Sequence, residues 1–170
     1  MSINLCLRDL ESSDLEFLKL IENDPRLWQY SDTKKPFTKD VLKMHIENSK
    51  QDIVTSGQKR FVLIDSQSNR LGLVDLFDYE KNNSRAAVGI VIIDKWRRNG
   101  YAKKGLELLE IRALKDTNIH QLYAGIISNN EPSRKLFRSA GYIEIEIKGQ
   151  GILNKNEFHH EIIVQKFLDA

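Results

Sequence analysis

Cysteine and proline are scarce in this chain of 170 residues, which contains one cysteine, Cys6, and three prolines. A single cysteine excludes an internal disulfide framework and a zinc site built from several cysteines. Cys6 lies in the apolar run 3–7, where we expect a packed strand thiol and not a nucleophile. The four histidines show no metal-ligand spacing, and we therefore predict no metal site.

Long apolar runs and a strong charge of one sign are also missing. No apolar stretch approaches the ~20 residues of a membrane-spanning helix. The first ten residues carry Arg8 and Asp9 where a secretory leader would have an apolar core. The net charge of +2 is nearly balanced, which disfavours a general nucleic-acid binder. We expect a cytoplasmic protein with no membrane or nucleic-acid partner.

The chain is long enough to form one sizeable hydrophobic core. Its composition, 41% hydrophobic and 29% charged, is ordinary for a globular protein. Because we find no repeat, low-complexity segment or linker, we predict a single domain over residues 1–170.

Hydrophobic periodicity and capping signals predict the element order β-α-α-β-β-β-α-β-α-β-β. The predicted strands are residues 3–7, 61–64, 71–77, 86–93, 122–127, 142–148 and 161–167. The predicted helices are residues 15–21, 38–46, 100–117 and 130–140, with residues 27–37 irregular. Residues 86–127 form a β-α-β crossover, whose two strands should be parallel. This order predicts an α/β fold with a mixed sheet covered by helices.

The segment Asp94–Lys104 is the most informative part of the sequence. It connects a predicted buried strand to a predicted helix and contains two arginines and three lysines. A helix N-terminus exposes unpaired N–H groups and a partial positive charge, which together suit a phosphate. Gly100 and the small Ala102 allow a ligand to approach the backbone closely. We therefore predict a pyrophosphate site here.

Two motifs on these elements resemble the Gcn5-related N-acetyltransferase (GNAT) superfamily. The family's acetyl-CoA loop, Gln/Arg-x-x-Gly-x-Gly/Ala, is matched by Arg97–Ala102. Its second motif is Asn-x-x-Ala/Ser-x-x-Leu-Tyr-x-x-x-Gly-Phe, in which Phe137 replaces the usual tyrosine. The residues that match this second motif are Asn130, Ser133, Leu136, Gly141 and Tyr142. The resemblance covers essentially the whole chain.

Further segments resemble the bacterial spermidine/spermine (diamine) N-acetyltransferase branch, although branches that act on protein N-termini share much of this likeness. They are Tyr30, Lys59–Val62, Gly72–Leu76 and Arg85–Ala86. The resemblance implies a GNAT-like, mostly antiparallel sheet of about seven strands flanked by about four helices. It also implies an enzyme that moves acetyl from acetyl-CoA to a primary amine, directly in a ternary complex.

The family likeness implies where acetyl-CoA would be held. The loop backbone and its cations, with Lys104 included, would bind phosphates, and pantetheine would pair with a strand edge that the family opens by a bulge and by splaying. A backbone N–H near Ile90 or Val91 would stabilise the oxyanion. The implied cofactor-binding residues are Ile90, Val91, Ile92, Arg97, Arg98, Asn99, Gly100, Tyr101, Ala102, Lys103, Asn130 and Ser133.

Proton transfer is where the sequence departs from the family. Candidates for the catalytic base are Asp75, Tyr79 and Glu80, each of which has solvated strand-end polarity as its alternative interpretation. Phe137 cannot protonate the departing thiolate. Either the thiolate leaves without a dedicated acid, as a thiol with a pKa of about 8.5 allows, or the proton comes from water or from a hydroxyl such as that of Tyr101 or Ser133.

The acceptor is the least determined feature. Tyr30, Asp32 and Asp75 are candidate substrate-binding residues, yet lysines follow Asp32, and Ala87 stands where the polyamine branch has glutamate. We rank a small amine or polyamine just above a peptide N-terminus. A CoA-binding sensor without catalysis, or a nucleic-acid contact through the short patch 95–98, is the alternative. Analogy with the family suggests a homodimer or a higher homo-oligomer.

Overall fold

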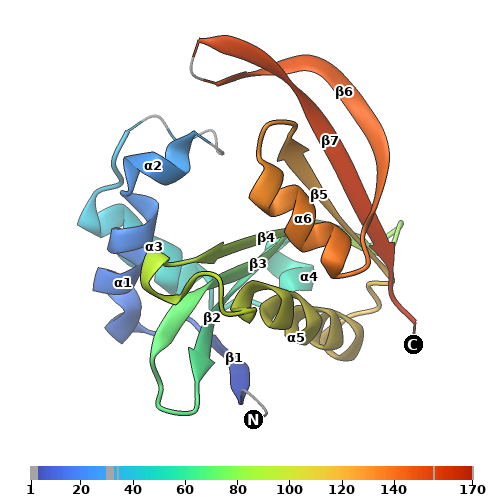
Figure 1. Cartoon of the computed structure of the whole chain (residues 1–170). Coiled ribbons are helices and arrows are strands. Elements are labelled where there is room, and N and C mark those ends of the chain that lie inside the picture. The colour runs from blue at the N-terminus through green and yellow to red at the C-terminus, as the bar shows by residue number, and fades with distance from the viewer. Residues whose placement is uncertain (1–3, 30–32, 34, 155, 170) are drawn as a thin grey trace.

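A computed structural model describes residues 4–29, 33, 35–154 and 156–169. One seven-stranded sheet, in the order β1-β2-β3-β4-β5-β7-β6, organises the chain (Figure 1). Its strands are β1 (Leu5–Asp9), β2 (Lys59–Asp65), β3 (Arg70–Glu80), β4 (Arg85–Ile92), β5 (Gln121–Ile127), β6 (Ile143–Asn154) and β7 (Glu157–Phe167). Among the described strands, β4 and β5 are paired in parallel and the other pairs are antiparallel. The predicted mixed sheet and its parallel crossover are confirmed.

The described residues form six α-helices where about four were predicted. They are α1 (Leu15–Glu22), α2 (Pro25–Trp28), α3 (Lys39–Asn48), α4 (Ile53–Ser56), α5 (Tyr101–Asp116) and α6 (Glu131–Ser139), with 3-10 turns at Ser12–Asp14 (η1) and Asp94–Trp96 (η2). The additional helices, α2 and α4, have four residues each. One helical turn is too short to show a hydrophobic period. No described helix is long and apolar enough to cross a membrane.

Capping explains why α2 forms within a segment predicted to be irregular. The side chain of Asp24 accepts a hydrogen bond from the N–H of Arg26 at 3.0 Å, and Pro25 occupies the first helical position. An aspartate cap followed by proline favours a helix start even when few residues follow. The short helix follows closely after α1, and most of its residues line the cleft described below.

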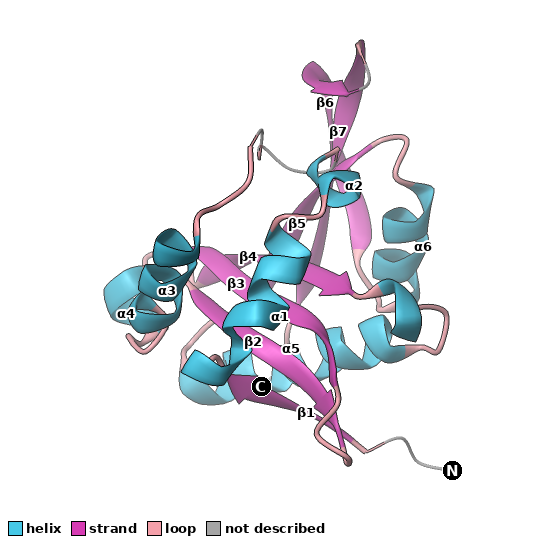
Figure 2. Ribbon diagram, turned by 90° about the vertical axis from the view of Figure 1, so that its left-hand side faces the viewer, coloured by secondary structure: helices cyan, strands magenta, loops and turns pink. Residues whose placement is uncertain are grey.

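Alternate residues of the central strands face two hydrophobic clusters, as the period of two in a strand requires. Phe61 and Leu63 pack in the cluster that contains α5, whereas Val62 packs in the cluster that contains α1 and α3. Figure 2 shows α1 in front of β2 and β3, with α5 on the far side of the sheet. The sheet is thus covered on both faces.

The strands β4 and β5 pair only over their first three residues, from Arg85↔Gln121 to Ala87↔Tyr123, and then diverge. This confirms the splaying that the family likeness implied. The bulge it implied in β4 is not found along the described β3–β4 pairing, which is continuous from Ala87 to Ile92. The irregularity lies instead after Phe77 of β3, where Asp78 has a φ of 48°.

The hairpin β6–β7 is longer than the sequence predicted. Residues 149–156 were expected to form a connection, yet β6 continues to Asn154 and β7 begins at Glu157. Figure 1 shows this arm curving past α6 and away from the rest of the sheet. Two glycines in this stretch, Gly149 and Gly151, weaken the strand signal, so pairing with β7 decides the conformation.

Asp14 is a fully buried carboxylate that ties β1 and β3 to the first turn. It accepts two hydrogen bonds from Arg8 at 2.8 and 2.9 Å, one from Arg70 at 2.7 Å and one from the N–H of Glu11 at 2.8 Å. Burial acts to raise the pKa of Asp14, but the bonds from Arg8, Arg70 and Glu11 outweigh it and lower this pKa to about 2.

The pKa of Asp14 makes the stability of the fold dependent on pH. Because it lies below the ordinary value of 3.8, the carboxylate stabilises the fold above about pH 4, and this contribution is lost as the pH falls toward 2. We expect Asp14→Asn to lower the free energy of unfolding at pH 7 by about 2 kcal/mol. The difference from wild type should shrink at low pH.

Urea unfolding at a series of pH values measures this effect. Asp116→Asn is the matched control, since Asp116 is 41% exposed and pairs with Arg112 on the surface of α5. The prediction would be contradicted if the free energies of unfolding of wild type and Asp14→Asn differed by the same amount at pH 7 and at pH 2.

Candidate active site

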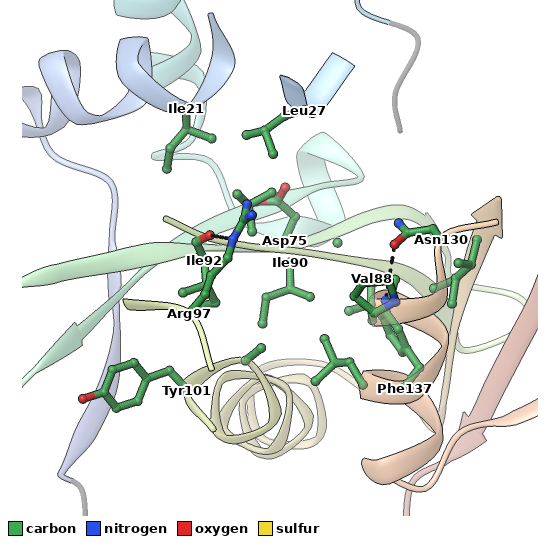
Figure 3. A pocket seen from close by; sticks show the side chains of 18 of the residues that line it. Ile21, Leu27, Asp75, Val88, Ile90, Ile92, Arg97, Tyr101, Asn130 and Phe137 are labelled. Carbon is green, nitrogen blue, oxygen red and sulfur yellow. Dashed lines mark hydrogen bonds between the residues drawn. The ribbon is translucent and has the colours of Figure 1, made fainter. Parts of the chain in front are cut away.

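The gap between β4 and β5 belongs to a cleft of about 1080 Å³. The cleft is lined by the basic loop before α5, by the ends of α1 and α2, and by α6. Figure 3 shows Ile90 near its middle, Asp75 toward α1 and α2, and Asn130 and Phe137 on the side of α6. One cavity therefore contains most of the predicted cofactor-binding residues and one predicted catalytic residue.

The loop before α5 has the conformation of an anion site. Arg98 and Gly100 adopt the left-handed region, with φ of 61° and 77°, which glycine tolerates without strain. Gly100 is the N-cap of α5, and no side chain caps this helix. The first-turn N–H groups of Tyr101, Ala102 and Lys103 are therefore available to a ligand. Nothing lies within 4 Å of a Cβ placed on Gly100, so a phosphate has room to approach.

Arg97 holds the loop closed, which differs from its predicted contact with phosphate. Its Nε donates to the carbonyl of Ile92 at 2.8 Å, and its guanidinium pairs with Asp94 at 2.8 Å. Asp94 in turn pairs with Arg26 of α2 at 2.6 Å. The sequence could not reveal this role, because Arg26 lies far from Arg97 along the chain.

Asn99 also has a structural role in the loop. Its side-chain Nδ2 donates to the carbonyls of Trp96 and Arg97 at 3.0 and 2.9 Å, and Asn99 is not among the described residues that line the cleft. Arg98 and Lys103 are exposed and do line it. Of the predicted loop cations, these two are placed to face an anion.

The alternation of β4 distinguishes the two predicted oxyanion donors. The N–H of Ile93 donates to the carbonyl of Leu71 on β3 at 3.0 Å. In an antiparallel pair, every second residue directs its backbone groups to the same neighbour. Val91 therefore faces β3, whereas Ile90 and Ile92 face the gap toward β5. The N–H of Ile90 is the one in position to reach a ligand there.

Asn130 and Phe137 occupy the wall formed by α6. The side chain of Asn130 caps the helix by accepting a hydrogen bond from the N–H of Ser133 at 3.3 Å (Figure 3). Phe137 lines the cleft, but it is 3% exposed and packs edge to face against Tyr142, with ring centroids 5.0 Å apart. The prediction that Phe137 is a core residue is confirmed.

The structure reduces the number of hydroxyl groups that could donate a proton to the departing thiolate. Tyr142 stands behind Phe137 and is itself buried; burial, and after it the Glu110 carboxylate, raise the pKa of its hydroxyl. Tyr101 points its hydroxyl away from the gap beside Ile90 (Figure 3). Ser133 lines the cleft and stays a candidate, together with water.

The structure does not bring Tyr79 and Glu80 to the cleft. Glu80 pairs with Arg85 at 2.7 Å and accepts from Asn83 at 2.6 Å, while Tyr79 packs against the core. The irregularity that precedes them redirects the end of β3, a change that no local sequence pattern announces. Asp75 does line the cleft. The other substrate-binding predictions, Tyr30 and Asp32, lie outside the described residues.

Asp75 belongs to an ion-pair cluster that sequence reasoning missed. Arg60 of β2 donates to both carboxylate oxygens of Asp75, at 2.8 and 3.0 Å, and to Glu22 of α1 at 2.7 Å. The three side chains are 21–22% exposed. Burial acts to lower the pKa of Arg60, but the charges and hydrogen bonds of Asp75 and Glu22 outweigh it and raise this pKa. All three residues line the cleft.

His45 of α3 adjoins this cluster. Burial, followed by the charge of Arg60, lowers the pKa of His45, so its imidazole is neutral at neutral pH. The signal that could have found the cluster is the presence of polar residues at inward-facing positions of β2 and β3. Within the described residues, no group of His, Cys, Asp and Glu side chains is arranged to hold a metal ion.

Comparison with protein families matches residues 4–143 to the acetyltransferase (GNAT) domain, and the chain belongs to this family. Relatives named spermidine N(1)-acetyltransferase occur in Vibrio cholerae and Escherichia coli. The one from Vibrio cholerae is 26% identical over 144 residues, which cover 85% of this chain and 82% of the relative. The one from Escherichia coli is 24% identical over 153 residues, which cover 87% and 78%.

Solved structures show the same fold. Spermidine N-acetyltransferase from Vibrio cholerae, in complex with CoA and spermine, has a TM-score of 0.88 at 21% identity, covering 97% of this chain and 96% of that one. RimL, an alpha-N-protein acetyltransferase of a ribosomal protein, in complex with coenzyme A, has a TM-score of 0.88 at 17% identity, covering 99% and 97%. The protein is an acetyl-CoA-dependent N-acetyltransferase of the GNAT type.

The loop geometry predicts that Gly100→Asp weakens CoA binding by about tenfold or more, since it places a carboxylate beside the pyrophosphate. The variant should fold, because the Cβ position of Gly100 has open space around it and aspartate is among the residues that best tolerate a positive φ. Gly57→Asp is the matched control: Gly57 has the same φ of 77° and nothing within 4 Å of its Cβ position. Calorimetric titration with CoA compares the two. Unchanged affinity in folded Gly100→Asp would place the pyrophosphate elsewhere.

Proposed function

We propose that the enzyme transfers acetyl from CoA to a primary amine of a small amine or polyamine, directly within a ternary complex. The observation that carries the proposal is that one cleft contains both the uncapped helix start at Gly100 and the carboxylates Asp75 and Glu22. The first feature suits the phosphates of CoA, and the second suits an ammonium ion. Relatives named for spermidine support a polyamine acceptor.

The chemistry requires a neutral amine at the thioester. An alkylammonium has a pKa of about 10.4 and must lose a proton before its nitrogen can attack. Asp75 is our candidate both to hold the ammonium and to receive or pass on that proton. The N–H of Ile90 stabilises the oxyanion formed by the attack. The attacking nitrogen, now positively charged, loses its second proton to water as the carbon–sulfur bond breaks. The thiolate leaves with its negative charge and takes a proton from water, so that one proton is released overall.

An acceptor screen tests this function. The purified protein is mixed with acetyl-CoA and a panel that contains spermidine, simple alkylamines, aminoglycosides and peptides with free N-termini, and thiol release is followed. We expect release with spermidine or a small alkylamine. If no member of the panel causes release while CoA binding is retained, the chain is a CoA-binding sensor and the enzymatic assignment of its cleft is wrong.

A peptide N-terminus is the second candidate acceptor. The observation in its favour is the fold likeness to RimL, whose name describes acetylation of a protein α-amine. The charges in the cleft also favour it, because Asp24 and Asp94 are already paired with arginines and are not available to the further ammonium groups of a polyamine. Faster thiol release with N-terminal peptides than with spermidine in the same screen would select this candidate.

Assembly with further copies of the chain is part of the proposal. The arm strand β6 exposes Ile143, Ile145 and Ile147, which are 59%, 47% and 67% exposed. Large exposed apolar side chains gathered on one element are typical of protein contacts. A solved structure of spermidine N-acetyltransferase from Vibrio cholerae is dodecameric, which supports an assembly of this kind.

Phe137→Tyr tests how the thiolate is released, because it restores the hydroxyl that the family motif carries. If the thiolate leaves without a dedicated acid, kcat with the best acceptor should change by less than about threefold near neutral pH. Tyr142→Phe is the control for altering the adjacent ring outside the cleft. An increase in kcat of about tenfold or more for Phe137→Tyr would show that the wild type lacks a needed acid.

A further inference from the structure

The strand β4 has a glycine directly beside the carboxylate of Asp75. Asp75 and Gly89 are register partners on β3 and β4, so their side-chain positions lie on the same face of the sheet. A Cβ on Gly89 would meet Asp75 Oδ2 at 3.5 Å and Phe77 Cε1 at 3.6 Å. These are ordinary contacts, and Gly89 is not among the left-handed glycines. Neither the backbone nor packing therefore requires glycine here.

The missing side chain leaves a space at a chemically important place. Gly89 lines the cleft, and the next residue along β4 is Ile90, whose N–H faces the gap between β4 and β5. A group in this space touches Asp75 and lies about one residue, or ~3.3 Å along the strand, from the proposed oxyanion donor. A position between a carboxylate and an oxyanion donor suits an attacking nitrogen and the carbon next to it.

The charges around this space favour a cation. Asp75 and Glu22 share the single guanidinium of Arg60, so the cluster has one negative charge in excess when both carboxylates are ionised. The remaining lone pairs of carboxylate oxygens can accept further hydrogen bonds. Two other acidic residues that line the cleft, Asp24 and Asp94, are balanced by contrast, because Arg26 pairs with both of them and Arg97 also pairs with Asp94. The excess negative charge is thus located at Asp75 and Glu22.

We propose that the acceptor's reactive ammonium is seated over Gly89 against Asp75 and Glu22, and that the absence of a side chain at residue 89 admits the carbon that bears the nitrogen. Arg60 is a positioning residue that holds both carboxylates toward this seat. The inference rests on the proposed amine acetylation, and it makes Gly89 and Glu22 determinants of acceptor specificity.

Gly89→Ala tests the space. The variant should fold, because its methyl group meets ordinary contacts only and alanine suits a strand better than glycine. We measure binding of spermidine and of n-butylamine to the CoA-loaded protein by calorimetry. The expected result is amine binding weakened by about tenfold or more, with CoA affinity changed less than about twofold. Gly149→Ala, on the exposed arm strand β6, is the matched control.

Glu22→Gln tests the charge. Glutamine keeps the shape of the side chain and an oxygen that Arg60 can still reach, but it removes the excess negative charge. We expect the same ammonium probes to bind about tenfold or more weakly, again with CoA affinity retained. Glu16→Gln is the control on the same helix, since Glu16 is 72% exposed and pairs with Lys39. n-Butanol, a neutral probe of similar shape, should not compete with n-butylamine.

The outcomes separate this proposal from the function on which it rests. Amine binding that both variants leave unchanged overturns the seat over Gly89, even if wild-type thiol release confirms amine acetylation. A wild-type CoA complex that binds neither probe also overturns it. If the probes bind and both variants weaken them, yet no amine causes thiol release, the seat is supported and the proposed catalysis fails.

Discussion

The divergence of β4 from β5 is the constraint on which the rest of this structure depends. Two parallel strands that stop pairing inside a sheet leave backbone N–H and C=O groups without ladder partners, and such groups must be satisfied if they are shielded from water. Arg97 satisfies the carbonyl of Ile92. The groups of Ile90 face the same gap, where the amide groups of pantetheine offer matching donors and acceptors. The divergence that opens the sheet therefore also provides the backbone groups with which CoA can pair.

The same divergence explains the arrangement of charge along the cleft. The basic loop closes on itself through Arg97 and Asp94 and leaves the start of α5 free of side-chain caps. Elsewhere in the cleft, Arg60 lies between Asp75 and Glu22 on the face otherwise packed by apolar side chains of α1 and α3. A partly buried carboxylate pair is costly unless a cation accompanies it. The guanidinium compensates one of the two charges, and an ammonium is suited to the other.

Local sequence features predicted the parts of this structure that local physics determines. The strand, loop and helix around Gly100 form as expected because a turn residue, a helix start and hydrophobic periods coincide within a few residues. The same holds for Asn130 as the cap of α6. The parallel crossover follows because connection rules leave few alternatives.

The remaining features depend on partners far apart in the sequence. Arg97 contacts α2 through Asp94 and Arg26, and the side chain of Arg60 meets that of Glu22, 38 positions away. Glu80, at the end of β3, lies outside the cleft because the pairing of β3 with β4 is irregular after Phe77. Hydrophobic periods, helix caps and motifs do not predict such contacts. A charged residue beside a predicted site can therefore stabilise a loop, pair with another charge or contact a ligand. Tertiary geometry decides among these roles.

The aromatic pair Phe137 and Tyr142 shows how a motif can keep its composition and change its chemistry. The family motif has a tyrosine and then a phenylalanine at these positions, and this chain has the reverse. The two rings touch edge to face, so the hydroxyl has moved from the ring that lines the cleft to the ring behind it. There, burial and Glu110 raise its pKa, which removes it from acid catalysis at the thioester. The wall of α6 keeps its packing, and in the mechanism proposed above water supplies the proton to the thiolate.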